Sequence, residues 1–192
     1  MSTSKALMPY HHGDLRNSLI EAGMSLLRGG GVAALTLRGA ARAAGVSATA
    51  TYRHFADKEA LLAAIAAEGF SRFGAALAAA DQAGEGVAAL RAQGVAYVEF
   101  AVAEPALFRL MFGAAKPCGD DTLSEAARAA FGILASRVAA LAGEADAETV
   151  TLAAWSIVHG LACLIVDGQI TAADPAELAA RIGERLRIGQ LR

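Results

Sequence analysis

Apolar residues recur along most of this chain at intervals of three and four, which is the spacing of amphipathic helices. β-Branched runs are few, and no stretch alternates apolar and polar residues for long enough to predict a strand. The pattern therefore predicts an all-α protein of about nine helices. The first helix is expected from about Asp14 to Leu27, just before three consecutive glycines at 29–31.

Two short helices are predicted between Thr36 and Phe55, on either side of Gly45. Thr36 and Ser47 suit their N-caps, because a hydroxyl accepts a hydrogen bond from an unpaired amide of the first turn. Gly45 lies where a helix commonly ends in a left-handed residue. Two short helices joined by such a turn predict a helix-turn-helix, which places its second helix in the major groove of DNA.

Six further helices complete the prediction. Asp57 caps a long fourth helix whose apolar residues step by four, and Gly84–Gly86 separates it from the fifth. Pro105 ends the fifth helix and begins a short sixth one that runs to Phe112. The last three are expected around Ala127–Leu141, over about Ala147–Val166, and from Asp174-Pro175 onward.

Charge divides the chain into a basic and an acidic part. Residues 1–58 hold seven lysine and arginine residues against three acidic ones, whereas residues 59–192 hold ten against sixteen. A basic end favours nucleic-acid binding, and an acidic remainder avoids it. We therefore expect a DNA-binding domain over residues 1–58 and a second domain over residues 59–192.

The chain predicts a cytoplasmic protein. Cys118 and Cys163 form no disulfide framework, and the N-terminus lacks the apolar core of a signal peptide. Residues 149–166 carry no Asp, Glu, Lys or Arg and reach the length of a membrane span. The acidic flanks Glu148 and Asp167 argue against a span, and a central or dimer-interface helix has the same composition.

Several residues of the helix-turn-helix are candidates for DNA contacts. Tyr52, His54 and Lys58 offer polar groups to phosphates, while Thr49 and Ala50 are placed to reach base edges. Thr36 and Ser47 are first of all caps, and Arg38 is more often a solvated charge than a base reader. The full candidate set is Thr36, Arg38, Ser47, Ala48, Thr49, Ala50, Tyr52, His54 and Lys58.

The run GVSATATYRHFADKEALL at 45–62 resembles the signature of the TetR family of bacterial transcription regulators, and YHHGDLRNSLIEAGMSLL at 10–27 resembles the first helix of one of its subgroups. Trp155, His159 and Gly160 are similar to the Trp-His-Gly signature of that subgroup's C-terminal domain, as is EPALFRLMF at 104–112. The resemblance implies an N-terminal helix-turn-helix domain, a C-terminal ligand-binding and dimerisation domain, and phosphate contacts from Tyr52, His54 and Lys58. Ala48–Ala50 departs from the family's usual pattern, so no operator sequence is carried over.

Trp155, His159, Cys163 and Asp167 lie on one helix face at steps of four. A metal site is disfavoured, because His159 and Asp167 are about 12 Å apart along the axis and zinc needs three or four ligands. A Cys163–His159 enzyme lacks an evident third group to orient the histidine. A packed core histidine and a ligand-pocket wall remain equally supported, and we predict neither a metal nor another cofactor.

We expect a mostly apolar cavity in the C-terminal domain, with Tyr97, His159 and Arg109 as its polar groups. Its effector is then a small apolar molecule, uncharged or with one acidic group. Because the eighth and ninth helices lack a polar face of ordinary width, we expect them to form a two-fold, four-helix dimer interface. The cavity candidates are Tyr97, Phe108, Met111, Phe131, Trp155 and His159, and the interface candidates are Leu178, Ile182 and Leu186.

The sequence thus predicts a sequence-specific DNA-binding regulator, a ligand-responsive repressor that binds a palindromic operator as a homodimer. Two alternatives stay open. One is a helical enzyme that uses Cys163 and His159, and the other is a ligand-binding dimer that does not bind DNA. Operator, effector and the sign of the response do not follow from the sequence.

Overall fold

The computed structural model describes residues 12–113, 117, 121–142 and 146–185. Within these ranges the chain forms nine helices and no strand, which confirms the predicted all-α fold. In chain order they are α1 His12–Ala34, α2 Leu37–Ala43, α3 Ala48–Thr51, α4 Lys58–Gln82, α5 Gly86–Ala103, α6 Pro105–Phe112, α7 Asp121–Ala142, α8 Ala147–Val166 and α9 Pro175–Arg185.

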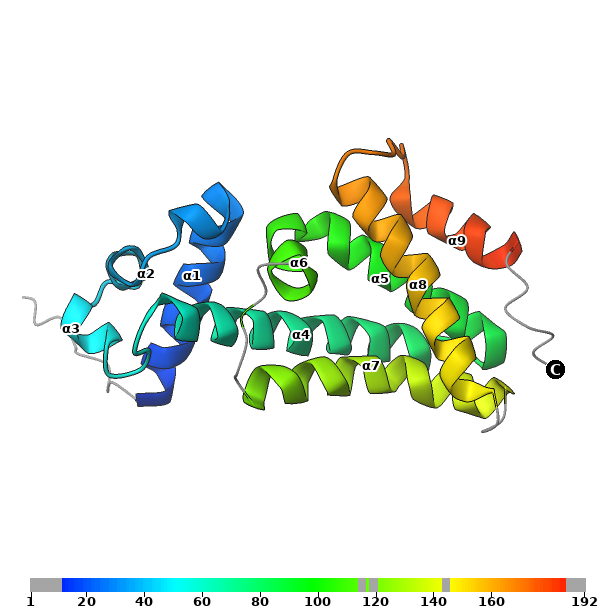
Figure 1. Cartoon of the computed structure of the whole chain (residues 1–192), viewed down its shortest axis with the longest axis horizontal. Helices are drawn as coiled ribbons and strands as arrows, with labels where there is room; N and C mark the ends of the chain where they lie inside the picture. The colour runs from blue at the N-terminus through cyan, green and yellow to red at the C-terminus, as the bar shows by residue number, and fades with distance from the viewer. Residues whose placement is uncertain (1–11, 114–116, 118–120, 143–145, 186–192) are drawn as a thin grey trace, which may run out of the picture.

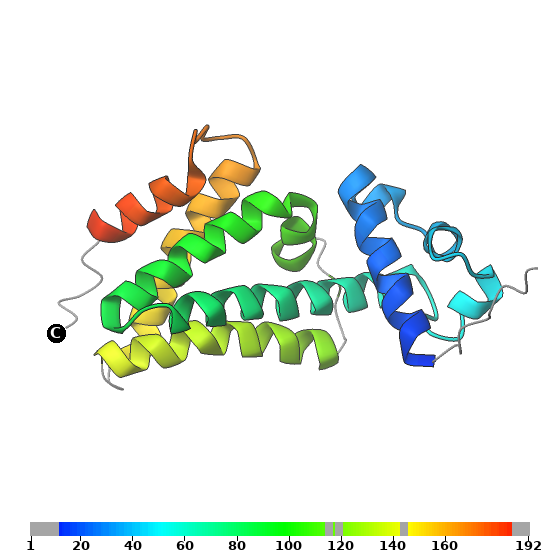
Figure 2. The ribbon, with the colours of Figure 1, turned by 180° about the vertical axis from the view of Figure 1, so that it is seen from behind.

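The helices form two groups along an elongated molecule (Figure 1). Helices α1, α2 and α3 make a small group at one end, and α5 to α9 make a larger group at the other. Helix α4 begins in the small group and runs the length of the large one, with α7 alongside it, as both views show (Figures 1 and 2). Because α4 belongs to both groups, it is the direct structural link between them.

Two element boundaries differ from the prediction. Helix α1 continues to Ala34, but Gly30 and Gly31 have non-helical backbone angles, so the expected break is present as a kink. The third helix was expected to reach Phe55, whereas α3 ends at Thr51 and turns follow. The amides of His54 and Phe55 both donate to the carbonyl of Thr51 at 3.0 Å, so the chain tightens here instead of continuing as a helix.

Helix α4 is the core of the molecule, and two glycines let its neighbours approach closely. A Cβ at Gly23 of α1 would lie 2.6 Å from the Cδ1 atom of Ile65 on α4. A Cβ at Gly69, one turn further along α4, would lie 2.7 Å from the Sδ atom of Met111 on α6. Helices α1 and α6 therefore press on neighbouring turns of the same helix.

Helix α9 carries two of the predicted interface residues within the described part of the chain. Leu178 and Ile182 are half-buried and pack against the core of their own chain, next to the buried Ala179. Leu186 lies outside the described residues. The part these residues take in a dimer interface stays a prediction, and the structure adds that α9 also packs against α5 of its own chain.

Two helices among the described residues, α4 and α8, are long and apolar enough to cross a membrane by length and composition. Most of α4 is buried inside the protein, as in the central helix of a soluble fold, but most of α8 is not. Leu152 and Leu164 of α8 are 46% and 44% exposed. Helix α8 therefore has an apolar face that its own chain leaves uncovered.

Candidate DNA-binding surface and ligand cavity

Local hydrogen bonds set the geometry of the helix-turn-helix. The hydroxyl of Thr36 accepts from the amide of Gly39 at 2.9 Å, and that of Ser47 accepts from the amide of Ala50 at 3.2 Å. Gly45 has a φ of 72° between the two helices, a conformation that favours glycine. The predicted caps and turn are confirmed, and they fix the direction in which α3 leaves α2.

A hollow of about 550 Å³ lies beside this motif, at the start of α2 and the start of α4. Thr36, Arg38, Tyr52 and Lys58 all contribute to its wall. Tyr52 is 54% exposed although it is large and aromatic. The hollow thus gathers a hydroxyl, a guanidinium, a phenol and an ammonium at the N-terminal end of α2. It also includes one carboxylate, that of Asp57, which accepts from the amide of Ala60, and with two cations against one anion the set suits a phosphate.

The other DNA candidates lie nearby but not in this hollow. Ser47 and Thr49 are exposed on α3, while Ala48 and Ala50 are half-buried. His54 is half-buried and does not border the hollow. Thr49 is therefore the residue of α3 itself with the most accessible side chain.

Lys58 has a structural role that the sequence did not indicate. Its Nζ atom donates to the carbonyl oxygen of Val32 at 2.7 Å, so it ties the start of α4 to the end of α1. An ammonium has three donors, so two remain for a phosphate. Arg53, which the sequence analysis passed over, adds an exposed cation next to Tyr52.

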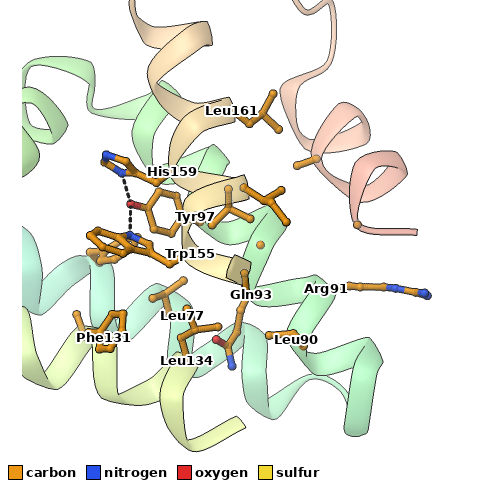
Figure 3. A pocket seen from close by; sticks show the side chains of 18 of the residues that line it. Leu77, Leu90, Arg91, Gln93, Tyr97, Phe131, Leu134, Trp155, His159 and Leu161 are labelled. Atoms are coloured by element: carbon orange, nitrogen blue, oxygen red, sulfur yellow. Dashed lines mark hydrogen bonds between the residues drawn. The ribbon is translucent and has the colours of Figure 1, made fainter. Parts of the chain in front are cut away.

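The C-terminal group of helices encloses a cavity of about 1070 Å³. Its wall comes from α4, α5, α6, α7, α8 and α9 and is mostly aromatic and aliphatic (Figure 3). Edge-to-face ring contacts hold the wall together, for example Phe73 with Tyr97 at 4.9 Å between ring centroids. Such a volume with a few polar groups has the size and character of a small-molecule site.

The structure brings together most of the predicted cavity residues. Tyr97, Met111, Phe131, Trp155 and His159 all border the cavity. Phe108 does not, because it is buried behind the wall, with its ring 5.7 Å from that of His159. Arg109 also faces elsewhere, as its guanidinium pairs with Asp167 at 3.1 Å on the surface. The expectations for Phe108 and Arg109 as cavity residues were wrong.

A chain of hydrogen bonds runs along the cavity wall (Figure 3). The indole Nε1 of Trp155 donates to the Tyr97 hydroxyl at 3.3 Å, and that hydroxyl lies 2.8 Å from Nδ1 of His159. Nε2 of His159 lies 3.5 Å from the Sγ atom of Cys163. Since an indole can only donate, we assign the Tyr97 hydroxyl as the donor to Nδ1, so that the single imidazole proton lies on Nε2 and faces the sulfur.

Burial controls the protonation of this chain. It lowers the pKa of His159 and raises the pKa of Tyr97, so the neutral form of both side chains is favoured. Burial and the nearby charge of Asp167 raise the pKa of the Cys163 thiol. The histidine and cysteine are therefore a neutral pair, not the imidazolium–thiolate pair that a nucleophilic enzyme uses.

Gln93 is a cavity residue that the sequence analysis did not identify. It is 2% exposed and borders the cavity from α5. Its Nε2 donates to Oδ1 of Asp81 at 2.6 Å, and Arg137 holds the same carboxylate through two bonds at 2.7 and 2.8 Å. Gln93 lies four residues before Tyr97 and so shares its face of α5, and that spacing is the signal that could have revealed it.

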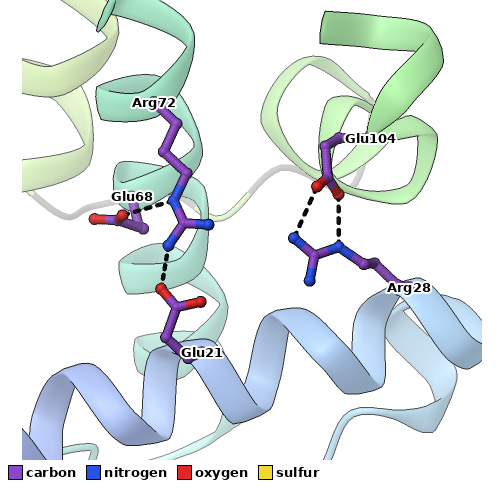
Figure 4. Close-up of polar contacts among 5 residues, drawn as sticks. All are labelled: Glu21, Arg28, Glu68, Arg72 and Glu104. Atoms are coloured by element: carbon purple, nitrogen blue, oxygen red, sulfur yellow. Dashed lines mark hydrogen bonds and ion pairs between the residues drawn. The ribbon is translucent and has the colours of Figure 1, made fainter.

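Ion pairs join the small group of helices to the large one (Figure 4). Arg28 of α1 grips Glu104, just before α6, through two bonds at 2.7 and 2.8 Å. Arg72 of α4 pairs with Glu68 at 2.7 Å and also with Glu21 of α1. The sequence carries no sign of the pairs Arg28–Glu104 and Arg72–Glu21, because their members lie more than fifty positions apart.

Among the described residues, no group of three or more His, Cys, Asp or Glu side chains is close enough to hold a metal ion. The stripe of Trp155, His159, Cys163 and Asp167 is part of a wall, with its polar atoms directed to each other and to Tyr97 and Arg109.

Two family models match the chain. One describes bacterial regulatory proteins of the tetR family and covers residues 19–65, which include α2 and α3. The other describes a tetracyclin repressor-like C-terminal domain and covers residues 90–186, which include most of the cavity wall. Among the curated proteins, none matches this chain.

Solved structures agree with these matches. A protein of unknown function from Rhodococcus sp. RHA1 is 37% identical, with a TM-score of 0.80 over 93% of this chain and 96% of that one. A tetR-family regulatory protein from Rhodococcus RHA1 is 25% identical, with a TM-score of 0.67 over 88% and 93% of the two chains. The regulator FadR from Bacillus subtilis, solved in complex with stearoyl-CoA, shares the fold at 14% identity, with a TM-score of 0.71 over 88% and 95%. From these matches over both groups of helices, we conclude that the chain belongs to the TetR family of transcription regulators.

Proposed function

We propose that this protein is a homodimeric repressor that releases a palindromic operator when a small molecule fills its cavity. Residues 1–58 bind DNA in this proposal, and residues 59–192 bind the effector and form the dimer. The observation that carries it is the presence, in one chain, of a polar hollow beside an exposed α3 and of a large apolar cavity, with α4 and α6 between them.

On the DNA side, α3 enters the major groove and the hollow receives a phosphate. Thr49 is exposed and offers a hydroxyl to a base edge, with the small residues Ala48 and Ala50 allowing a close approach. Tyr52, Arg38 and Lys58 bind the phosphate, helped by the N-terminal end of α2. His54 and Ser47 lie at the edges of this contact surface.

The dimer forms through the uncovered face of α8. Leu152, Ser156, Gly160 and Leu164 follow at steps of four and therefore share one side of the helix. A Cβ at Gly160 would meet no atom within 4 Å, so this side is open. Two copies packed on this side would form an isologous interface and would set two copies of α3 toward successive major grooves.

Helix α6 is the proposed coupling element between effector and DNA. Met111 and Phe112 of α6 face the cavity, while Glu104 at its start holds Arg28 of α1 (Figure 4). Arg109 ties α6 to the end of α8 through Asp167. An effector that displaces Met111 therefore also disturbs two contacts of this part of the chain. One is the packing of Met111 on Gly69 of α4, and the other is the ion pair of Glu104 with Arg28 of α1.

The cavity wall supports an apolar effector. FadR from Bacillus subtilis, which shares the fold, was solved in complex with stearoyl-CoA, so this architecture is compatible with a ligand that carries a long apolar chain. We place the chain in the Trp-His-Gly subgroup, because Trp155 and His159 line the cavity while Gly160 lies on the open side of α8. A regulator of this kind acts in the cytoplasm, and we propose that location here.

A regulator without enzymatic activity is preferred over the Cys163–His159 enzyme. Tyr97 does supply the third group that the sequence did not reveal, since its hydroxyl lies 2.8 Å from Nδ1 of His159. However, the pKa of the Cys163 thiol is raised and Cys163 does not border the cavity. The sulfur is thus neither activated nor presented to a substrate.

Selection of bound duplexes from a random pool tests the DNA-binding function. We expect the enriched DNA sequence to be palindromic, with half-sites about one or two helical turns apart. With three phosphate contacts per protomer, log affinity should fall against log salt with a slope of about −5. Tyr52→Phe removes only one hydroxyl and should weaken binding to all duplexes alike, whereas Arg128→Gln on the exposed side of α7 should leave it unchanged. If no sequence is enriched in the selection, the result contradicts the DNA-binding function and favours the alternative of a ligand-binding dimer that does not bind DNA.

A further inference from the structure

Among the described residues, the buried part of the cavity wall carries no charged side chain. Arg91 and Glu184 also border the cavity, but both are exposed to solvent. Figure 3 shows the Arg91 side chain directed away from the other labelled residues. His159 is held neutral by burial. A carboxylate or an ammonium inside the cavity would therefore lose its hydration without gaining a partner of opposite charge.

The polar groups around Tyr97 satisfy one another. Trp155 donates to Tyr97, Tyr97 donates to His159, and His159 faces the sulfur of Cys163. A ligand that displaced these contacts would have to replace three hydrogen bonds in sequence, so this part of the wall acts as an apolar surface toward most molecules. Recognition by a polar group must come from elsewhere in the cavity.

Gln93 supplies that group. Its Oε1 atom exposes less than 1 Å² and has no hydrogen-bond partner among the described residues, so a ligand that reaches it must displace part of the cavity wall. The amide cannot be turned around, because its nitrogen faces the carboxylate of Asp81, and an oxygen in that place would face a negative charge. Arg137 and the Gln93 amide lower the pKa of Asp81, so the carboxylate stays ionised and the orientation is fixed.

An unpaired buried carbonyl oxygen destabilises the empty protein, and a ligand that donates to it removes that penalty. In the view of Figure 3, Gln93 and His159 lie at opposite ends of the labelled cluster, with Tyr97 and Trp155 between them. A molecule along the apolar wall would thus place one end near the Gln93 amide. Leu77 and Leu134 border the cavity beside it and would pack against the body of the molecule.

We propose that the effector is an uncharged, largely apolar molecule that donates one hydrogen bond to Oε1 of Gln93, as a phenol, an alcohol or a neutral amide can. This inference rests on the proposed effector function of the cavity and narrows it, because it excludes acids and molecules that carry only acceptors. Asp81 and Arg137 act as positioning residues that hold the Gln93 amide in place.

Three matched probes test, on the wild-type protein, whether the cavity prefers an uncharged hydrogen-bond donor. They are octylphenol, its methyl ether and octylbenzoic acid. They share the alkyl chain and the ring but differ in the polar end, which donates, only accepts, or is charged. Binding is followed by the fluorescence of Trp155, the single tryptophan of the chain, and by calorimetry. We expect the phenol to bind about tenfold more tightly than the ether, the value of one hydrogen bond to an otherwise unpaired acceptor. The acid should bind more weakly than both.

The variant Gln93→Met keeps the side-chain volume and removes the acceptor, so the preference for the phenol should disappear. Gln82→Met makes the same change at an exposed glutamine outside the cavity and should keep the preference. Equal binding of phenol and ether to the wild type, tightest binding of the acid, or a preference that survives in Gln93→Met would each overturn the inference. A protein that prefers the phenol but binds no DNA would uphold it and contradict the proposed repressor.

Discussion

The two groups of helices use their buried volume in opposite ways. In the small group, the side chains of Leu19, Leu35 and Phe55 are at most 2% exposed, and the polar hollow lies on the outer surface. In the large group, aromatic rings surround about 1070 Å³ of space, and α8 leaves apolar side chains uncovered. A DNA reader needs a fixed shape, whereas a sensor needs room that a ligand can fill. The same chain therefore combines a filled core with an unfilled one.

The largest expected effect is the loss of stability when a side chain is removed from the filled core of the small group. Phe55→Ala removes a ring that is 2% exposed, and should lower the free energy of unfolding by about 3–5 kcal/mol. Phe131→Ala removes a ring from the cavity wall that is already 38% exposed, and should cost less than about 1 kcal/mol. Urea denaturation followed by circular dichroism measures both. Equal losses would show that the cavity wall is as tightly constrained as the core around Phe55.

A second prediction concerns the uncovered face of α8. Leu164→Glu would place a carboxylate in the proposed dimer interface and should weaken the dimer by about 3 kcal/mol, on the order of a hundredfold. Sedimentation velocity would then show monomers, and operator affinity would fall with the dimer. Ala129→Glu, on an exposed position of α7, is the matched control. A Leu164→Glu dimer of unchanged affinity would move the interface to another surface.

The third prediction concerns the joint between the two regions. Arg28→Gln should reduce the effect of a cavity ligand on operator affinity by about 0.5–1 kcal/mol, because a half-exposed ion pair contributes no more than that. Glu104→Gln and the double variant complete a cycle that isolates the pair from its separate roles. Single and double variants with the same reduced response would assign the coupling to this pair. Additive changes would assign it to the packing of α6 on α4.

The smallest effect is a dependence on pH in the large group. Because burial lowers the pKa of His159, the folded protein binds its proton less readily than the unfolded chain does. Stability should therefore fall as the pH drops below about 6.5, the ordinary pKa of histidine, and should be unaffected at higher pH. His159→Gln should flatten this decline in thermal melts. An identical decline in the variant would assign it to other groups.

The small group of helices could be predicted from the sequence because its signals are local. Thr36, Ser47 and Asp57 act on amides three positions ahead, and Gly45 acts on its own backbone. Helix α8 was also predicted with its observed bounds, since a break on each side marks an apolar run. The misplaced end of α3 has a local cause too, because the turns that follow it satisfy the same amides as a helix would.

The cavity could be predicted only in part, because its wall is assembled from six helices. The composition indicated which residues are large and apolar but not which of them face the cavity. Phe108 was therefore predicted to line the cavity, whereas it lies behind the side chains that do. The orientation of α9 also escaped prediction, since its amphipathic pattern fits a dimer partner as well as α5. Gln93 could not be recognised as unpaired without the carboxylate of Asp81, twelve positions away, in view.

The glycine at position 69 has a consequence for how such a regulator can evolve. A methyl group there would lie 2.7 Å from the sulfur of Met111 and 3.0 Å from Leu107, so α6 would have to move or Met111 would have to enter the cavity. Either shift resembles the displacement of α6 that we propose for a bound effector, while the rest of the core keeps its side chains. A single substitution of Gly69 by alanine would then mimic a bound effector at all times. A regulator could in this way lose its response to the effector during evolution and still keep its fold.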